Sequence, residues 1–141
     1  FVNSQSCFEI RIRGFHTDLY GHVNNARYLE FLESGRWQLF EESEDFDRLI
    51  NGQESFVVVA ISINYRRALV LNELAQVYTR LKSIGERSAV LYQEVRESKS
   101  GAVCADAEVT FVISDGEKAM SLVGEWRELL QSLPSDFSEL S

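Results

Sequence analysis

A single long helix among several strands is what the hydrophobic pattern of this chain predicts. From Asn25 to about Glu42 the apolar residues recur at the spacing of an α-helix, whereas most other patterned segments alternate with the period of two that is typical of strands. This order predicts an α+β domain in which a curved sheet wraps one helix. We expect a single domain over residues 1–141, with 135–141 as a loose tail. The buried face of the helix should carry Tyr28, Leu32, Gly35 and Leu39.

Five strands are predicted from alternating apolar and polar side chains. They are expected at about residues 8–13, 55–67, 75–82, 89–95 and 103–113, with turns at 85–88, 98–101 and 115–116. The segment 55–67 is apolar at both parities in its first half. This pattern predicts a central strand beneath the helix, whose later half reaches an edge or an interface. A short helical turn is expected at 44–51 and a second helix near 125–133.

Composition narrows the classes of partner. The net charge of -8 disfavours nucleic-acid binding, because an acidic surface repels phosphate backbones, but an anionic small molecule needs only a local cluster of Arg or Lys. No apolar run of about 18 residues could span a membrane, and the first residues lack the features of a signal peptide. Cys7 and Cys104 are too few for a disulfide framework, so we expect two reduced thiols in a cytoplasmic protein.

The polar loop before the long helix carries the candidate chemistry. Asp18 lies in this loop, and the helix should begin at Asn24 or Asn25, a residue type that favours helix caps. The first N–H groups of a helix have no intrahelical partner, so they can polarise a carbonyl oxygen that a nearby carboxylate attacks or hydrates. Asp, Gly and Asn are also ordinary turn and cap residues, so the residue types alone leave both interpretations open.

The same loop and helix resemble a family signature. The run Asp18-x-x-Gly21-His22-Val23-Asn24-Asn25-Ala26-x-Tyr28, followed by 29–33, resembles the signature of hotdog-fold acyl-CoA thioesterases in the 4-hydroxybenzoyl-CoA thioesterase superfamily. It is most similar to the bacterial long-chain acyl-CoA thioesterases, as is the segment 56–68. The resemblance implies the hotdog fold and hydrolysis of acyl-CoA, with long-chain fatty acyl-CoA as substrate. No cofactor is implied, because coenzyme A is part of the substrate. A homodimer or homotetramer with strands paired across the interface is also implied.

The resemblance assigns roles to the loop and the helix N-terminus. Asp18 is the expected nucleophile or general base, and both roles stay open. His22 either orients water or substrate or is an ordinary loop histidine. Asn25, a further catalytic candidate, stands where several relatives carry a histidine, and Gly14 stands where some carry a tyrosine, so no acid role is carried over to either. The backbone N–H groups expected to polarise the thioester oxygen are those of Val23, Asn24 and Asn25.

Polar residues beyond the loop are the expected contacts of the CoA phosphates. For each of them a solvated surface position is an equally open interpretation. The candidates are Arg66, Arg67, Lys82 and the Arg87-Ser88 turn, and this turn resembles a basic turn that the superfamily uses for that purpose.

Other sites and functions fit the residues less well. Glu33 is an alternative catalytic carboxylate, although an ion pair with Arg36 one turn away, half buried in the helix, is the favoured interpretation. His16, Asp18 and His22 lie too close together in sequence for a two-histidine iron site, so no metal is expected. The Asp-x-Asn-x-x-His pattern of hotdog hydratases is absent from the sequence. The remaining alternatives are a thioesterase for acyl carrier protein or aryl-CoA thioesters and a noncatalytic acyl-binding protein.

Overall fold

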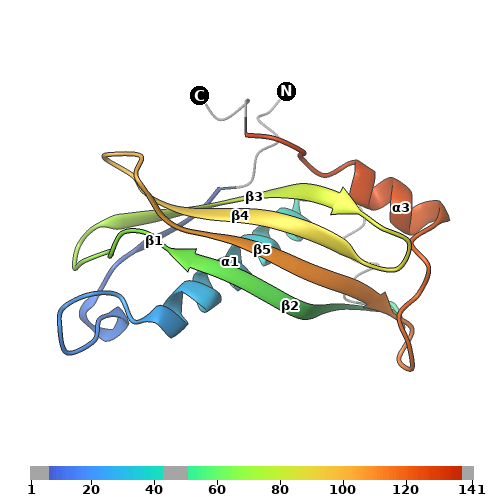
Figure 1. Ribbon diagram of the computed structural model, residues 1–141, viewed down its shortest axis with the longest axis horizontal. Helices are drawn as coiled ribbons and strands as arrows, with labels where there is room; N and C mark the ends of the chain where they lie inside the picture. Colours follow the sequence, from blue (N-terminus) through green and yellow to red (C-terminus); the bar gives the residue numbers. More distant parts are fainter. Residues whose placement is uncertain (1–6, 43–50, 138–141) are drawn as a thin grey trace.

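A five-stranded antiparallel sheet and one long helix form most of the computed structural model, which describes residues 7–42 and 51–137 (Figure 1). The order of elements along the chain confirms the predicted α+β architecture. The strands are β1 (Cys7–Arg11), β2 (Ser55–Tyr65), β3 (Leu74–Ile84), β4 (Ala89–Glu97) and β5 (Val103–Ser114). The helical elements are the 3₁₀ turn η1 (Gly14–His16), α1 (Asn25–Glu41) and α3 (Gly124–Gln131).

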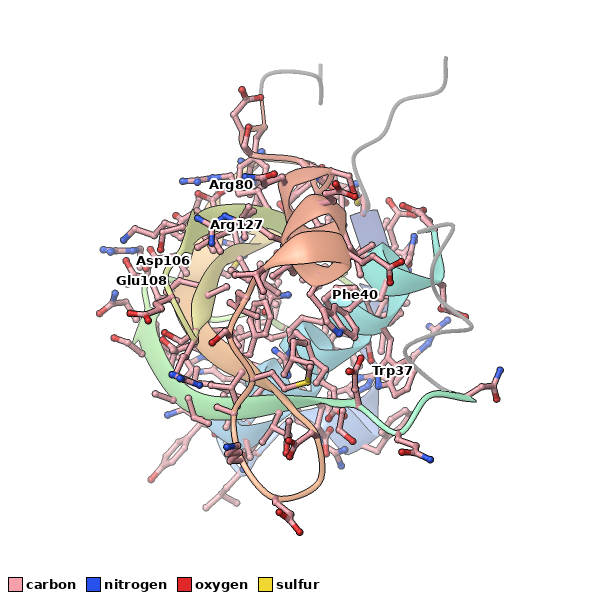
Figure 2. All side chains as sticks on the ribbon, turned by 90° about the vertical axis from the view of Figure 1, so that its right-hand side faces the viewer. Trp37, Phe40, Arg80, Asp106, Glu108 and Arg127 are labelled. Carbon is pink, nitrogen blue, oxygen red and sulfur yellow. The ribbon has the colours of Figure 1, made fainter. Side chains whose placement is uncertain are left out.

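The strand order in the sheet is β1-β3-β4-β5-β2, and every neighbouring pair is antiparallel. Register shifts interrupt three of the pairings, between Val58 and Ala60, between Leu81 and Ser83, and between Val95 and Arg96. Such irregularities bend strands and increase their twist. The sheet accordingly curves around α1, as the view in Figure 2 shows.

The inner face of α1 is apolar and packs on β1, β3 and β4. Its buried residues are Tyr28, Phe31, Leu32, Gly35, Arg36, Leu39 and Phe40. All four residues predicted for this face are among them, so that prediction is confirmed. Gly35 lies at a close approach, because a Cβ atom there would be only 2.6 Å from Cγ1 of Val77 on β3.

The core has two parts along the helix. The first surrounds the N-terminal half of α1, where Tyr28, Phe31 and Leu32 meet residues of β3, β4 and β5. The second surrounds the C-terminal half, where Leu39 and Phe40 pack with α3 and the other end of the sheet. The polar loop is attached to the first part, since both Ile12 before it and Val23 at its end are buried there.

A small polar network lies inside the contact between helix and sheet. Arg36 is only 8% exposed, and its Nη1 donates to Oε1 of Gln93 at 3.1 Å. The Gln93 amide in turn donates to the carbonyl of Leu32 and to Oγ1 of Thr79, both at 2.9 Å. Glu33 is exposed, so the prediction that it lies half buried is wrong. Burial lowers the pKa of Arg36, and the charge of Glu33 partly opposes this effect.

The position of β2 differs from the prediction. Its first half was expected at the centre of the sheet, but in the described part of the chain β2 pairs with β5 alone and lies at an edge. The central position is therefore wrong, whereas the edge position predicted for its later half is correct. Its apolar residues remain partly uncovered: Val57, Val59 and Ile61 are 38%, 56% and 37% exposed.

Two further predictions concern connecting and terminal segments. Nearly all of the helical turn expected at 44–51 falls on residues 43–50, outside the described residues. The segment 135–141, expected to be loose, begins in contact with the sheet, because the ring of Phe137 lies 5.9 Å from that of Tyr78 and 6.0 Å from that of Tyr92. Residues 138–141 lie outside the described chain. Within the described ranges, no helix is long and apolar enough to cross a membrane.

Candidate active site

The carboxylate of Asp18 organises the tight loop between η1 and α1. Its Oδ1 accepts hydrogen bonds from the backbone N–H of Tyr20 at 2.9 Å and of His22 at 3.2 Å. The loop is closed by backbone bonds as well, since the Asp18 N–H donates to the His22 carbonyl at 2.8 Å and Gly21 adopts a φ of 77°. In this described loop, Oδ2 has no hydrogen bond and Asp18 is exposed. One carboxylate oxygen therefore holds the loop while the other is free to react.

The start of α1 presents fewer free donors than the sequence predicted. The N-cap is Asn24, whose Oδ1 accepts from the Ala26 N–H at 2.9 Å. The Val23 N–H donates to the Leu69 carbonyl at 2.9 Å, and the Asn24 N–H donates to the His16 carbonyl at 3.0 Å. The prediction that these two amides face a substrate is therefore wrong. Among the three proposed donors, all in the described chain, the N–H of Asn25 is the one without a hydrogen bond.

A tyrosine at the end of β2 reaches the same helix terminus. The hydroxyl of Tyr65 donates to the Asn25 carbonyl at 3.2 Å. Its ring packs edge-on against the buried ring of Tyr28, with 5.4 Å between centroids. The alternating pattern placed this residue in the predicted strand 55–67 and gave it no role in the site, because nothing in a local pattern shows that the end of β2 meets the start of α1.

The two histidines occupy different environments. His16 is buried beside Phe31, and its Nδ1 accepts the Arg13 N–H at 2.8 Å, which requires a neutral ring to carry its proton on Nε2. Burial lowers the pKa of His16 and so favours this neutral form. His22 is exposed and touches the Asp18 carboxylate through its backbone N–H. The structural role of His16 was missed, since it depends on tertiary burial.

Two of the predicted CoA contacts lie at the end of the sheet that carries Asp18. Arg66 and Arg67 directly follow Tyr65, and both are paired: Arg66 with Asp106, and Arg67 with Glu73 through Nη2 and Oε2 at 2.8 Å. The Arg66 side chain is still 56% exposed and that of Arg67 38%. Both guanidinium groups therefore remain accessible to an anionic ligand.

The other predicted CoA contacts lie at other places in the fold. Arg87 and Ser88 belong to the turn between β3 and β4, at the end of the sheet opposite the Asp18 loop (Figure 1). Arg87 Nη1 donates to the Ala119 carbonyl at 3.2 Å, and Ser88 closes its turn by accepting the Gly85 N–H at 2.7 Å. Lys82, near that end of β3, pairs with Glu108 on the outer face of the sheet. Within one chain these residues are not brought together with Asp18.

Among the residues that the structure describes, no three His, Cys, Asp or Glu side chains gather into a group that could hold a metal ion. His16, Asp18 and His22 were considered from the sequence as a two-histidine iron site, and no metal was expected there. In this loop His16 Nδ1 is occupied by a backbone donor, and Asp18 Oδ1 is occupied by two.

Comparison with known proteins identifies the family. Residues 14–139 match the family model described as the thioesterase-like superfamily. The chain belongs to this superfamily. The long-chain acyl-CoA thioesterase FadM of Escherichia coli is 45% identical to this chain over 127 residues, or 89% of this chain and 96% of the relative.

Solved structures of thioesterases have the same fold. The crystal structure of YbaW, a probable thioesterase from Escherichia coli, aligns with a TM-score of 0.84 at 44% identity and covers 89% of this chain and 96% of its own. A Thermus thermophilus thioesterase crystallised with coenzyme A and Zn aligns with a TM-score of 0.76 at 26% identity, covering 89% and 97%. The hotdog fold implied by the sequence resemblance is confirmed.

A thioesterase-like site requires a carboxylate or an activated water, a donor for the thioester oxygen and a way to hold the acyl carrier. In this chain the free oxygen of Asp18 and the free N–H of Asn25 lie on either side of the Val23–Asn24 connection. Glu33 lies on α1 about 12 Å beyond Asn25, at 1.5 Å per residue, and on an exposed face. Asp18 lies in the loop that leads directly into this free amide, whereas Glu33 lies about two helical turns beyond it.

Proposed function

We propose that this protein hydrolyses acyl-CoA thioesters to the free acid and CoA, with long-chain fatty acyl-CoA as its substrate. The observation that carries the mechanism is the Asp18 carboxylate, which has one oxygen free in the loop just before the unpaired N–H of Asn25. The family and the relative FadM, named for long-chain acyl-CoA, support the substrate class. Both cysteines are free thiols, which supports a reducing, cytoplasmic location.

Asp18 can act in two ways. As a general base it takes a proton from water, the hydroxide adds to the thioester carbon, and the C–S bond breaks to release the CoA thiolate, which is then protonated. As a nucleophile its oxygen adds to the same carbon, releasing the thiolate and leaving a mixed anhydride that water hydrolyses. In both routes the Asn25 N–H donates to the oxygen that gains negative charge. The reaction needs water and no cofactor.

Steady-state hydrolysis of a panel of saturated acyl-CoAs of increasing chain length tests the substrate class. We expect kcat/KM to rise with chain length and to exceed the values for a benzoyl-CoA and for the same acyl group on acyl carrier protein. A preference for the carrier protein or the aromatic thioester would assign the alternative substrates. Binding of acyl-CoA without turnover would identify a noncatalytic acyl-binding protein and overturn the proposal.

Arg66 and Arg67 are the proposed contacts of the CoA phosphates. They lie at the Asp18 end of the sheet with exposed guanidinium groups. Arg87 and Ser88 lie at the opposite end, so they can contribute only from a second subunit. An Arg66→Gln variant should raise KM for acyl-CoA while leaving KM for an acyl-pantetheine, which lacks the nucleotide phosphates, unchanged. An equal rise for both substrates would show that Arg66 acts on the fold and not on phosphate.

We infer that the protein is a homodimer formed along β2, and that a homotetramer would consist of two such dimers. In the described chain the outer edge of β2 has no strand partner, and an unpaired edge is a template for pairing with another chain. Val57, Val59 and Ile61 on this strand are more than a third exposed. A two-fold pairing of antiparallel β2 strands would cover these side chains and satisfy the backbone groups of the edge.

A further inference from the structure

Tyr65 links the edge strand to the catalytic end of α1. Its hydroxyl donates to the carbonyl of Asn25 at 3.2 Å, and its ring meets the ring of Tyr28 at an interplanar angle of 75°. Tyr28 is firmly held, because it is 2% exposed and its hydroxyl oxygen accepts the Leu69 N–H at 3.1 Å. Tyr65 itself is 44% exposed. A buried ring thus supports a more exposed one, whose hydroxyl touches the first residue of the helix.

Around the start of α1, the N–H of Asn25 is the amide left free to donate to a substrate among the described residues 23–26. The N–H groups of Val23 and Asn24 are used by Leu69 and His16, and the Asn24 side chain caps the N–H of Ala26. The Asn25 N–H is what remains for a thioester oxygen in this described region. A donor contributes to the transition state only when its direction is set before the reaction, because hydrogen bonds weaken steeply as their angle departs from linearity.

The Tyr65 hydroxyl is suited to setting that direction. The carbonyl that it contacts and the free N–H belong to the same residue, so restraining one end of Asn25 restrains the other. A carbonyl oxygen has two lone pairs, so the Asn25 carbonyl can accept from Tyr65 and also from the helix ladder. The ring of Tyr65 would suffice to cover Tyr28, and the hydroxyl is therefore the part that packing alone does not require.

We propose that Tyr65 is a positioning residue, whose hydroxyl holds Asn25 at the start of α1 so that the Asn25 N–H points at the thioester oxygen. The inference rests on the proposed hydrolysis at Asp18 and assigns a role to a residue that the sequence pattern had placed only in a strand. Tyr65 acts through Asn25 and needs no contact with the substrate.

Tyr65→Phe is the direct test, because it keeps the ring on Tyr28 and removes only the hydroxyl. With a long-chain acyl-CoA, kcat and kcat/KM should fall together by about three- to tenfold, the range expected for one lost hydrogen bond, while KM stays unchanged and the melting temperature falls by no more than a few degrees. The mass of the assembly in solution should also equal that of the wild type. An unchanged kcat would overturn the proposal, as would a fall accompanied by a changed mass or by partial unfolding at the assay temperature.

The matched control is Tyr92→Phe. Tyr92 is a strand tyrosine on the outer face of the sheet, and its hydroxyl donates to Glu94 at 2.7 Å. Its removal should leave kcat unchanged. In nuclear magnetic resonance spectra, the backbone amide signal of Asn25 should shift in Tyr65→Phe and stay in place in Tyr92→Phe. A loss of kcat without a shift of this signal would contradict positioning through Asn25.

An Asp18→Asn variant separates this inference from the proposed function. If Asp18→Asn is inactive and Tyr65→Phe is fully active, the hydrolytic site stands and the positioning role is wrong. If Asp18→Asn is fully active, the proposed site itself is wrong. If both variants lose activity to the expected extents and the Asn25 signal shifts, both proposals are supported.

Discussion

At the scale of single residues, the Asp18 loop resembles another turn of the same chain. Asp115 also accepts two backbone N–H groups on Oδ1, from Glu117 at 2.9 Å and Lys118 at 3.0 Å. The two aspartates therefore stabilise their turns in the same way, but of these two only Asp18 precedes the N-terminus of a long helix. The difference in their surroundings, and not in their local geometry, is what makes Asp18 the catalytic candidate.

This pair provides a controlled test of catalysis. Asp18→Asn keeps an oxygen that can accept the Tyr20 and His22 N–H groups, so the loop should survive while the charged oxygen is lost. We expect kcat for acyl-CoA hydrolysis to fall by at least about 100-fold, with an unchanged melting temperature. Asp115→Asn should leave kcat unchanged. Near-normal turnover by Asp18→Asn would remove Asp18 from the mechanism.

Gly35 allows a second residue-scale prediction, on stability. A Cβ at this position would lie 2.6 Å from Val77 Cγ1, well inside van der Waals contact. Gly35→Ala should therefore push α1 from β3 and lower the free energy of unfolding by about 1–3 kcal/mol, as measured by chemical denaturation. Adding Val77→Ala should recover part of this loss. If Gly35→Ala is as stable as the wild type, the close approach of α1 to the sheet is not as the structure has it.

At the scale of elements, the sequence predicted most helix and strand positions. The helix was expected from Asn25 to about Glu42 and is observed over Asn25–Glu41, because capping and apolar periodicity are local properties. The strand order was not predictable in the same way. Periodicity reports how many faces of a strand are apolar, but it does not report whether a helix or a second chain covers them, and β2 was placed centrally for this reason.

The turn between β4 and β5 allows a prediction of pH dependence. Glu97 accepts the Lys99 N–H at 2.9 Å on Oε2, and the Ser100 N–H and hydroxyl at 3.0 and 2.8 Å on Oε1. These bonds, led by that of the Lys99 N–H, lower the pKa of Glu97 to about 2. Because the folded-state pKa is depressed, the stabilisation is complete above the unfolded pKa of about 4.3 and is lost as the pH falls toward 2.

Glu97→Gln should consequently be less stable than the wild type at neutral pH. The difference in free energy of unfolding between the two proteins should shrink as the pH falls from about 4.3 toward 2. Urea denaturation across this range measures the difference. A difference that stays constant with pH would mean that the ionised carboxylate contributes nothing to the turn.

At the scale of the whole molecule, the unpaired edge of β2, with its partly exposed apolar side chains, is the main feature that the described chain leaves uncovered. α1 packs mainly on β1, β3 and β4, so the two strands on the other side of the sheet, β5 and β2, lack comparable cover from this helix. The predicted CoA contacts are also divided between the two ends of the sheet, because Arg66 follows β2 at the end that carries the Asp18 loop and Arg87 lies in the β3–β4 turn at the other end (Figure 1). Both observations are consistent with a site completed by a second subunit.

A charge placed on the β2 edge tests this assembly. Val59, at the register shift of β2, is 56% exposed, and Val59→Glu would bury a carboxylate in the proposed interface. We expect analytical ultracentrifugation at micromolar concentration to give the mass of one chain for Val59→Glu and of at least two for the wild type. Val123→Glu, at a valine that is 66% exposed before α3, should assemble like the wild type. A monomeric wild type would contradict the inference.

The sequence by itself determined the type and order of the elements, the inner face of α1 and the loop carboxylate before its cap, because each of these follows from residues close together in the chain. The tertiary structure decided which helix amide stays free, because the carbonyls of Leu69 and His16 accept the neighbouring N–H groups. It also decided which hydroxyl contacts the carbonyl of that same residue, because Tyr65 comes from β2. It also made β2 an edge. These features depend on contacts between segments distant in sequence, and no local periodicity carries information about such contacts.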